Sequence, residues 1–510
     1  MFSSVISGTV HGMDRYLISV EVDFSQGLPC FVMVGSLSPE VRESAERVRI
    51  ALKNMKITIP PMHICVNLSP ADIKKNGTRF DFPIALGLLT AMERISPSSL
   101  KNTLVLGEVG LNGEIKRVDG VMPIVWEAAK NGIGRCLVPK DNAREASLVD
   151  DMEVIGIESI DEALRYLNSD SQSMESIVLP TRNSFVINQN TSEIGDFAEI
   201  SGQESLKRGA LIAAAGGHHL LLMGPPGSGK TMIASRLPSI MPPLTMEERM
   251  DITAIYSIAG KLTKERPVIN QRPFVAPHHT VSPQGITGGG SIPRPGAVSL
   301  AHKGILFLDE LPEFRRETID LLRQPLEEGS INISRASGSF TYPARVMLVA
   351  AMNPCPCGYY PDVQRCSCPP AAIKRYLSHI SGPILDRIDI CLTASRVKIK
   401  DLQEKSSGMS STEMKEIVVR CRELQKERYS GEAYSLNSGL DVNGIKRYCH
   451  LGDTENQMLE RMCNSLEISA RGYHRLLRVA RTIADLDLSE EIKREHLTEA
   501  LCYRPQLPKC

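Results

Sequence analysis

The chain of 510 residues has no long apolar run. Its longest uninterrupted apolar stretches, such as residues 346–352, have the length of a buried strand, whereas a membrane-spanning helix needs about 18 apolar residues or more. The first residues read Met-Phe-Ser-Ser-Val-Ile-Ser-Gly and have neither the basic start nor the apolar centre of a secretory signal. Both absences predict a cytoplasmic protein with no membrane partner.

The sequence also lacks an excess of charge of either sign. Its 59 Lys and Arg residues balance 59 Asp and Glu residues, and 42% of the chain is hydrophobic. A strongly basic chain would have indicated nucleic-acid binding through electrostatics alone, and that argument does not apply here. Any surface that binds a polyanion must therefore be local.

A disulfide framework is not expected. Thirteen cysteines, an odd number in a long chain without an export signal, are typical of reduced thiols. Four of them form two C-x-C pairs: Cys355, Cys357, Cys366 and Cys368. Four thiolates so close in sequence suit a tetrahedral Zn²⁺ site, although zinc ligands are more often spaced C-x₂₋₄-C. Zinc and a group of reduced structural cysteines are both open interpretations of this pattern.

The patterns along the chain predict an α/β protein in four parts. Residues 1–168 mix short alternating strands with helical patterns, and residues 169–195 are polar and aperiodic, which is typical of a linker. A second α/β unit spans residues 196–396. Strand signals then stop, and helical patterns predict a helical lid over residues 397–510. A chain of this length is expected to form several domains.

The most specific motif lies in the third part. Residues 224–231 match the P-loop pattern G-x-x-x-x-G-K-[ST] at every position, between an apolar strand pattern and the start of a helix. The glycines let backbone N–H groups face phosphate oxygens, and the helix N-terminus adds partial positive charge. Lys230 would reach the β- and γ-phosphates and Thr231 would bind Mg²⁺, so ATP and Mg²⁺ are the predicted ligands. The predicted nucleotide-binding residues are Gly224, Pro225, Pro226, Gly227, Ser228, Gly229, Lys230 and Thr231.

Two further strand patterns end in polar residues that would complete an ATPase site. Residues 304–310 end in Asp309 and Glu310, as a Walker B strand does. Asp309 would hold Mg²⁺ and Glu310 would polarise the attacking water as a general base. The next strand pattern ends in Asn353, which would orient that water. Asn before proline is also a common turn residue, but its position after the two nucleotide motifs favours the functional interpretation.

Two arginines nearer the C-terminus are candidates for contacts with the phosphates. Arg387 could stabilise transition-state charge at the γ-phosphate of a neighbouring subunit, as an arginine finger does, and a salt bridge to Asp386 or Asp389 is the alternative. Arg471 opens a helical pattern of the lid and is a candidate second sensor of the phosphates. Helices carry many solvated arginines, so Arg471 is singled out by its order and position.

These motifs resemble the magnesium-chelatase-like AAA+ ATPases of the YifB/ComM family. The resemblance covers nearly the whole chain and is carried by Gly202-Gln203, the P-loop, and the segments ILFLDELPEF, PHHTVSPQGITGGG, MNPCPCG, SGPILDRIDI and SARGYHRLLRVARTIADL. It implies a ring hexamer with nucleotide at the subunit interfaces. It also implies a motor that acts on DNA, as a helicase or in branch migration during recombination or natural transformation.

Two inserts in the ATPase core are the candidate DNA-contacting segments. Residues 277–296 are rich in Gly and Pro, and residues 329–346 have the pattern of a hairpin. In AAA+ relatives such loops project into the ring pore. Solvated loop residues are the default interpretation of the candidates, which are His278, His279, Lys303 and Arg335. Arg345 could instead face the nucleotide interface.

The N-terminal part resembles the proteolytic domain of Lon-type proteases, which shares the fold of the second domain of ribosomal protein S5. Residues 74–87 and 107–122 carry this resemblance. Active members need a Ser nucleophile that a Lys base activates. Here the serine segment reads Gly-Thr-Arg-Phe-Asp at 77–81 and the lysine position is Met122, so no peptidase activity is expected.

The sequence therefore predicts an ATP-hydrolysing hexameric motor on DNA. The alternative is the motor subunit of a metal-chelatase-type or protein-remodelling complex that does not act on DNA. A nucleotide-gated scaffold without hydrolysis is disfavoured by the presence of all four of Lys230, Asp309, Glu310 and Arg387.

Overall fold

The computed structural model describes residues 1–150, 152–168, 178–179, 195–263, 265–290, 293–335, 338–362, 364–396 and 408–504. The predicted linker at 169–195 lies outside these residues except for positions 178–179 and 195. The chain forms two compact units. Unit 1 comprises residues 1–188 and 246–270, and unit 2 comprises residues 189–245 and 271–510. The model confirms the predicted class: a mixed-sheet α/β domain, a parallel-sheet core and a helical C-terminal region.

Unit 1 is built on a mixed eight-stranded sheet with the strand order β10-β9-β8-β5-β1-β2-β4-β3. In β2, Ile18, Val20 and Val22 are fully buried and alternate with partly exposed residues, which is the period of a strand with one face on a core. The strands are β1 (Phe2–His11), β2 (Asp14–Ser25), β3 (Cys30–Val34), β4 (His63–Ser69), β5 (Thr103–Val105), β8 (Arg135–Pro139), β9 (Glu153–Ile157) and β10 (Val178–Leu179), with a small hairpin of β6 (Glu108–Val109) and β7 (Ile115–Lys116).

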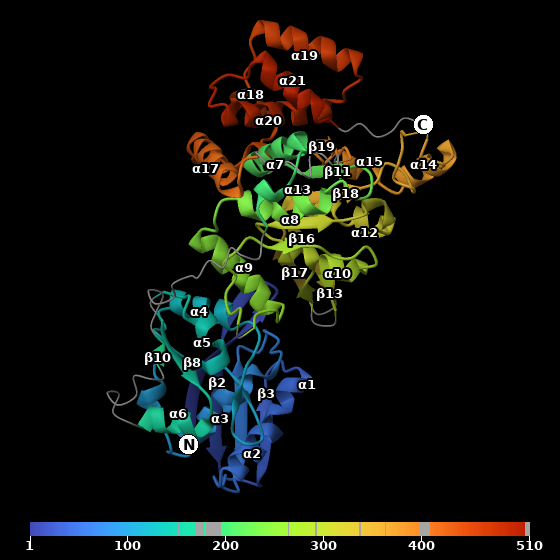
Figure 1. Ribbon diagram of the computed structural model, residues 1–510. Helices are drawn as coiled ribbons and strands as arrows, with labels where there is room; N and C mark the ends of the chain where they lie inside the picture. The colour runs from blue at the N-terminus through green and yellow to red at the C-terminus, as the bar shows by residue number, and fades with distance from the viewer. Residues whose placement is uncertain are drawn as a thin grey trace. The chain divides into compact units, whose positions relative to one another are not determined.

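The helices of unit 1 cover this sheet. All residues of α3 are buried, and the helix packs on β1 and β2. Gly87 permits this approach, because a Cβ there would lie 2.7 Å from a methyl carbon of Val22. The other helices, seen in Figure 1 with the blue and cyan strands, are α1 (Pro39–Arg42), α2 (Ser44–Asn54), α4 (Val121–Lys130), α5 (Lys140–Ala146) and α6 (Ile160–Asn168); α3 spans Asp81–Ala91.

One helix of unit 1 comes from the middle of the ATPase sequence. Helix α9 (Met246–Ile258) follows the P-loop helix in the chain, yet it packs against α4. The Ser257 hydroxyl donates a hydrogen bond of 2.8 Å to the Glu145 carboxylate, and the Gly120 N–H donates to the Ser257 carbonyl at 3.2 Å. Residues 246–270 thus pack within unit 1, and the predicted bounds of the ATPase core, 196–396, remain a prediction.

The buried Glu145 that contacts Ser257 of α9 predicts that the stability of unit 1 depends on pH. Burial raises the pKa of Glu145 to about 7 from the ordinary 4.5, although hydrogen bonds from Asn142 and Ser257 oppose the rise. The neutral form of Glu145 is favoured in the folded protein because the folded-state pKa is the higher one. Its contribution to the free energy of unfolding, measured against Glu145→Gln, is therefore full below pH 4.5. This contribution falls by up to about 3 kcal/mol as the pH rises to 7.

The single tryptophan, Trp126, lies on α4 and reports the unfolding of unit 1. Urea midpoints followed by its fluorescence should converge or cross between pH 4.5 and pH 7 as the wild type loses its stability advantage over Glu145→Gln. Parallel pH profiles of the two proteins would contradict the prediction.

Unit 2 contains a five-stranded parallel sheet in the order β12-β15-β18-β11-β19. The strands are short and wholly apolar where they are central, as expected for a parallel sheet covered on both faces. Their bounds are β11 (Leu220–Met223), β12 (Phe274–Val275), β15 (Ile305–Leu308), β18 (Met347–Met352) and β19 (Ile390–Thr393).

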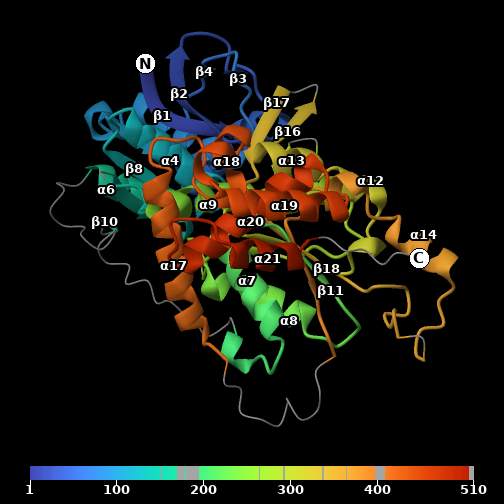
Figure 2. The same ribbon diagram turned by 90° about the horizontal axis from the view of Figure 1, so that it is seen from above.

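Helices surround this sheet and continue into the C-terminal region. Val479 and Ile483 of α20 share one hydrophobic core with Leu211 and Ala215 of α7, and Figure 2 shows α20 beside α21. No helix in the described ranges combines the length and the apolar composition of a membrane span. The helices are α7 (Glu204–Gly216), α8 (Lys230–Ile240), α12 (Arg316–Asp320), α13 (Arg323–Glu328), α14 (Pro370–Leu377), α15 (Gly382–Leu385), α17 (Ser411–Arg428), α18 (Val442–Tyr448), α19 (Asp453–Ser465), α20 (Ala470–Leu486) and α21 (Arg494–Cys502).

The two predicted inserts pack against each other at the end of unit 2 that lies opposite to α19 and α21 (Figure 1). The Tyr342 hydroxyl of the second insert donates to the Pro293 carbonyl of the first at 2.7 Å. A Cβ at Gly288 would lie 3.1 Å from the Ile333 side chain. The first insert holds α10 (Pro283–Thr287), β13 (Gly288–Gly289), β14 (Arg294–Pro295) and α11 (Ala297–Leu300), and the second is the hairpin of β16 (Ser330–Arg335) and β17 (Gly338–Pro343).

Candidate functional site

Three predicted motifs end at the same edge of the parallel sheet of unit 2. Met223 of β11 is paired with Met352 of β18, and Leu308 of β15 is paired with Ala350 of β18. The P-loop, Asp309 and Asn353 each follow one of these strands. The sheet register therefore brings together residues that are far apart in sequence, at the carboxyl ends where ligands bind in open α/β sheets.

The P-loop has the backbone of a phosphate cradle. Gly227 and Gly229 have φ angles of +74° and +83°, and a Cβ at either would find no atom within 4 Å. Their glycine identity therefore serves the left-handed backbone and leaves the loop surface open. Helix α8 begins directly afterwards, at Lys230, so its free N–H groups point toward the loop.

Lys230 lies inside this loop and contacts the neighbouring strand end. Its ammonium donates to the carbonyls of Gly224 at 2.8 Å and Pro225 at 2.9 Å, and to the Asn353 amide oxygen at 3.3 Å. Burial lowers the pKa of Lys230, and the nearby Asp309 carboxylate opposes this effect. The lysine is thus held by neutral oxygens that an anionic phosphate would replace.

Thr231 and Asp309 form the oxygen pair expected of a Mg²⁺ site. The Thr231 hydroxyl donates to Asp309 Oδ2 at 3.0 Å, and Asp309 Oδ1 accepts from the Glu310 N–H at 3.0 Å. Hydroxyl and carboxylate oxygens are the ligands that Mg²⁺ takes together with phosphate oxygens. The residues present therefore fit this ion.

Glu310 has a left-handed backbone conformation and lies close to His279. Its φ is +53°, a conformation that non-glycine residues seldom adopt outside functional or strained positions. The His279 ring nitrogen Nδ1 lies 3.6 Å from its carboxylate. His279 was predicted to be a DNA-contacting residue; β12, the strand before it, has only two residues and gives little strand signal in the sequence.

The four clustered cysteines converge after Asn353. The Sγ atoms of Cys355, Cys357 and Cys366 are separated by 3.3 to 3.7 Å, and all four sulfurs lie within 4.8 Å of one another. A tetrahedral Zn²⁺ with bonds of about 2.3 Å would place its sulfurs about 3.8 Å apart. Hydrogen bonding, first of all with the backbone at Tyr359, lowers the pKa of Cys357 to about 6. The described cysteines form no disulfides, and this cluster has the geometry of a metal site.

Comparison with known proteins identifies the family. Models of the magnesium chelatase subunit ChlI match residues 196–402 and 20–142, and a model of the ChlI C-terminal part matches residues 408–504. Competence protein ComM of Haemophilus influenzae is 42% identical over 98% of this chain and 97% of its own length. The chain belongs to the magnesium-chelatase ChlI family. The resemblance predicted from the sequence is thereby confirmed.

Other relatives show the breadth of the ChlI family. The uncharacterized protein YifB of Escherichia coli is 41% identical over 97% of this chain and 95% of its own length. The magnesium-chelatase 38 kDa subunit of Chlorobaculum parvum is 23% identical over 61% of this chain and 91% of its own length. The chain is thus a ChlI-family ATPase and a full-length homologue of ComM and YifB.

The two predicted arginines of this ChlI-family chain lie away from its own P-loop. Arg387 comes three residues before β19, whose first residue Ile390 is paired with Leu220 at the start of β11. It is therefore at the amino edge of the sheet, opposite to the P-loop. Its guanidinium forms an ion pair with Glu327 and not with Asp386 or Asp389, and its side chain is only 15% exposed.

Arg471 lies near the same edge. Its side chain is 70% exposed and 3.8 Å from Asp386, the neighbour of Arg387 in sequence. Arg475, one turn further along α20, donates to the Leu385 carbonyl at 2.9 Å and thereby holds the start of α20 against this segment. Arg387 and Arg471 thus lie on either side of one segment at the amino edge of the sheet.

The remaining predicted DNA contacts separate into two groups. Arg335 is exposed at the end of β16, and His278 is exposed beyond β12. Lys303 and Arg345 precede β15 and β18, and the Lys303 N–H donates to the Arg345 carbonyl at 2.7 Å. Both therefore lie at the amino edge of the sheet, so Arg345 is on the opposite edge from the P-loop of its own chain.

Proposed function

We propose that this ChlI-family protein is an ATP-hydrolysing ring motor, a hexamer, that acts on DNA as a helicase or branch-migration enzyme. The observation that carries the ATPase part is the convergence of Lys230, Thr231, Asp309 and Asn353 at one sheet edge through hydrogen bonds of 3.0 to 3.3 Å. Glu310 follows directly and has a half-exposed carboxylate, which leaves it accessible to a water molecule.

Each residue has a role that its position supports. Lys230 neutralises phosphate charge, and its present carbonyl partners orient it toward the loop. Thr231 and Asp309 hold Mg²⁺, which supplies positive charge to the phosphates when bound. Asn353 orients the attacking water, and Glu310 accepts its proton. The His279 ring lies 3.6 Å from the Glu310 carboxylate, and we assign it to positioning this carboxylate.

The ring assembly is supported by the place of the two arginines. Arg387 and Arg471 lie at the edge of the sheet opposite to their own P-loop, so we assign them to the phosphates of a neighbouring subunit. In a closed ring of identical subunits, each arginine edge would face the carboxyl edge of its neighbour. An arginine supplied in this way stabilises the transition-state charge of phosphoryl transfer.

The DNA substrate is supported by two observations. A relative that is 42% identical is named competence protein ComM, and this name favours a role with DNA. The two core inserts pack into a single projection that carries the exposed Arg335, and a basic side chain on such a projection can contact phosphates. We assign this projection to DNA binding.

DNA is expected to stimulate ATP hydrolysis by the wild-type protein. Arg335→Glu should weaken the apparent DNA affinity in this assay roughly tenfold, because a phosphate contact becomes a repulsion. Basal hydrolysis should not change. The matched control is Arg447→Glu in the lid, whose side chain is 69% exposed. Hydrolysis would be measured with single-stranded and forked DNA, and equal effects of the two variants would contradict the assignment.

A motor that acts on a protein or metal-inserting partner is the second candidate. It is favoured by the ChlI models and by the similarity to a magnesium-chelatase subunit. If neither DNA structure stimulates hydrolysis or is unwound, while Lys230→Ala abolishes basal hydrolysis, this second function replaces the first.

The cysteine cluster is proposed to hold one Zn²⁺. The sulfur separations match a tetrahedral site, and four cysteine sulfurs are a donor set that zinc prefers. Its role is structural, because four protein ligands leave no open position for a substrate.

A further inference from the structure

The cysteine cluster closes a loop that begins at the predicted water-orienting residue. Cys355 is buried two residues after Asn353, and its sulfur accepts a hydrogen bond of 3.4 Å from the Tyr360 N–H. The Gly358 N–H donates to the Cys355 carbonyl at 2.9 Å, which completes a tight turn. A metal bound by the four sulfurs would fix both ends of the segment 358–365.

This turn packs directly against Pro226 of the P-loop. Gly358 has a φ of +83°, and a Cβ there would lie 2.5 Å from the Pro226 ring and 3.7 Å from the Asn353 side chain. Pro226 follows Gly224 and Pro225, whose carbonyls hold Lys230. The position of the cysteine turn therefore limits where the phosphate-binding backbone can lie.

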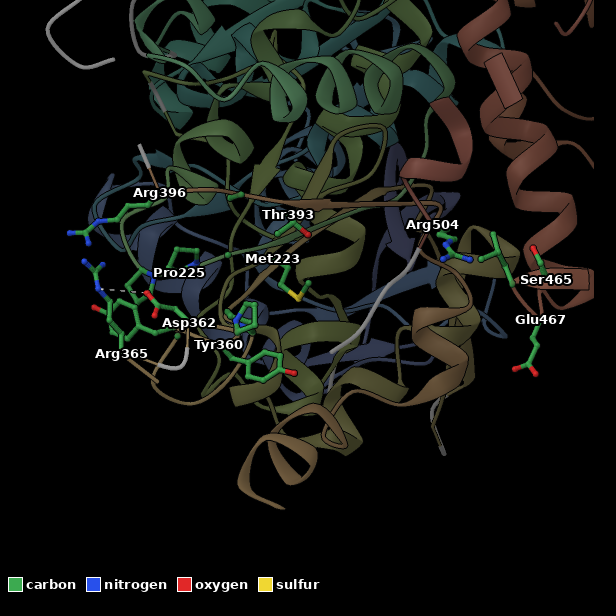
Figure 3. A pocket seen from close by; sticks show the side chains of 18 residues that line it. Met223, Pro225, Tyr360, Asp362, Arg365, Thr393, Arg396, Ser465, Glu467 and Arg504 are labelled. Atoms are coloured by element: carbon green, nitrogen blue, oxygen red, sulfur yellow. Dashed lines mark ion pairs between the residues drawn. The ribbon is translucent and has the colours of Figure 1, made fainter. Parts of the chain in front are cut away.

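The same loop forms one wall of a cavity of about 1190 Å³ that adjoins the P-loop. In Figure 3, Asp362 and Arg365 lie on one side of this cavity and Glu467 and Arg504 lie on the other. The Asp362 carbonyl accepts from the Cys366 N–H at 2.8 Å, so this wall is tied to the second cysteine pair. The loop thus joins the metal site to both the P-loop and the cavity beside it.

We infer that the bound metal fixes the cysteine loop against the P-loop and thereby orders the nucleotide site. Metal binding and nucleotide binding are then coupled. The inference rests on the proposed ATPase function. With the metal bound, the loop is held against Pro226 and the P-loop keeps its open form. Without the metal, the loop and the P-loop must be ordered when nucleotide binds, and this lowers the affinity. By linkage, nucleotide must also strengthen metal binding by the same factor.

The test measures metal content and nucleotide affinity on the full chain. Wild type should contain about one zinc per chain, and a zinc-selective chelator should weaken binding of a fluorescent ADP analogue roughly tenfold. Added Zn²⁺ should restore it. Cys366→Ser with Cys368→Ser should lose the zinc and match the chelated protein, whereas Cys30→Ser with Cys502→Ser, two exposed cysteines outside the cluster, should match wild type.

A second variant separates the loop contact from the metal itself. Gly358→Ala keeps the four sulfurs but places a methyl group against Pro226, so it should retain zinc and still bind nucleotide more weakly than wild type. Gly431→Ala is the matched control, since Gly431 has a φ of +85° and no atom within 4 Å of an added Cβ. Gly431→Ala measures the effect of an alanine at a positive φ alone, without a contact like the one between residue 358 and Pro226.

The outcomes are distinguishable. Absence of zinc from wild type, or an affinity that does not change when zinc is removed, would overturn the inference and leave the ATPase proposal standing. The same holds if Gly358→Ala binds nucleotide like Gly431→Ala. A wild type that binds no nucleotide with zinc present would overturn the ATPase proposal itself.

Discussion

Replacing Glu310 with glutamine is expected to slow ATP hydrolysis roughly 100- to 10,000-fold, the range that a general base contributes. The amide keeps the size of the side chain and cannot accept the proton of the attacking water. ATP binding should be nearly unchanged, because Lys230, Thr231 and Asp309 retain their contacts. Single-turnover hydrolysis and a separate binding titration would measure the two effects.

Glu313→Gln is the matched control for this prediction. Glu313 is an exposed acid three residues further along the same turn, and its N–H donates to the Glu310 carbonyl at 2.8 Å. The control changes the charge of the same segment and leaves Glu310 in place, so hydrolysis should continue at the wild-type rate. Equal losses in the two variants would show that Glu310 acts only through the general charge of this segment.

Replacing Lys230 with alanine is expected to weaken ATP binding roughly 10- to 100-fold and to abolish measurable hydrolysis. A charge-assisted hydrogen bond to phosphate contributes about 1.5 to 3 kcal/mol, and the same ammonium is needed as charge moves to the phosphates in the transition state. Because Lys230 is buried in the loop among carbonyl oxygens, no other described lysine occupies this position.

Binding of a fluorescent ATP analogue and release of inorganic phosphate would measure these two losses. Lys374→Ala, an exposed lysine on α14, is the control and should behave like wild type. An ATPase rate in Lys230→Ala within a few-fold of wild type would contradict the assignment of residues 224–231 as the nucleotide site.

The short-range features of this protein could be predicted from the sequence. The strand at Leu220–Met223 and the helix that starts at Lys230 are where the P-loop pattern places them, because apolar runs and glycines act through local backbone preferences. The family and the α/β class followed from motifs in the same way. The hairpin of β16 and β17 was also predictable, from two alternating segments around a short turn.

Features that depend on distant contacts could not be predicted in this way. Nothing in residues 246–258 distinguishes a helix that packs in the ATPase core from one that packs on α4, because both need the same apolar pattern. The proximity of His279 to Glu310 depends on the pairing of the short strand β12 with β15. The sequence pattern at His279 predicted a DNA contact and not this proximity to Glu310.

The sequence by itself determined the chemistry that this chain has available: a P-loop, two carboxylates after a strand, and four clustered thiols. These are properties of residue types and spacing. Only the tertiary structure decided which groups share a site, since sheet register and turn packing bring together residues that are distant in the chain. That packing joins Lys230 to Asn353, places Arg387 at the opposite edge, and sets the cysteine turn against the P-loop through Gly358.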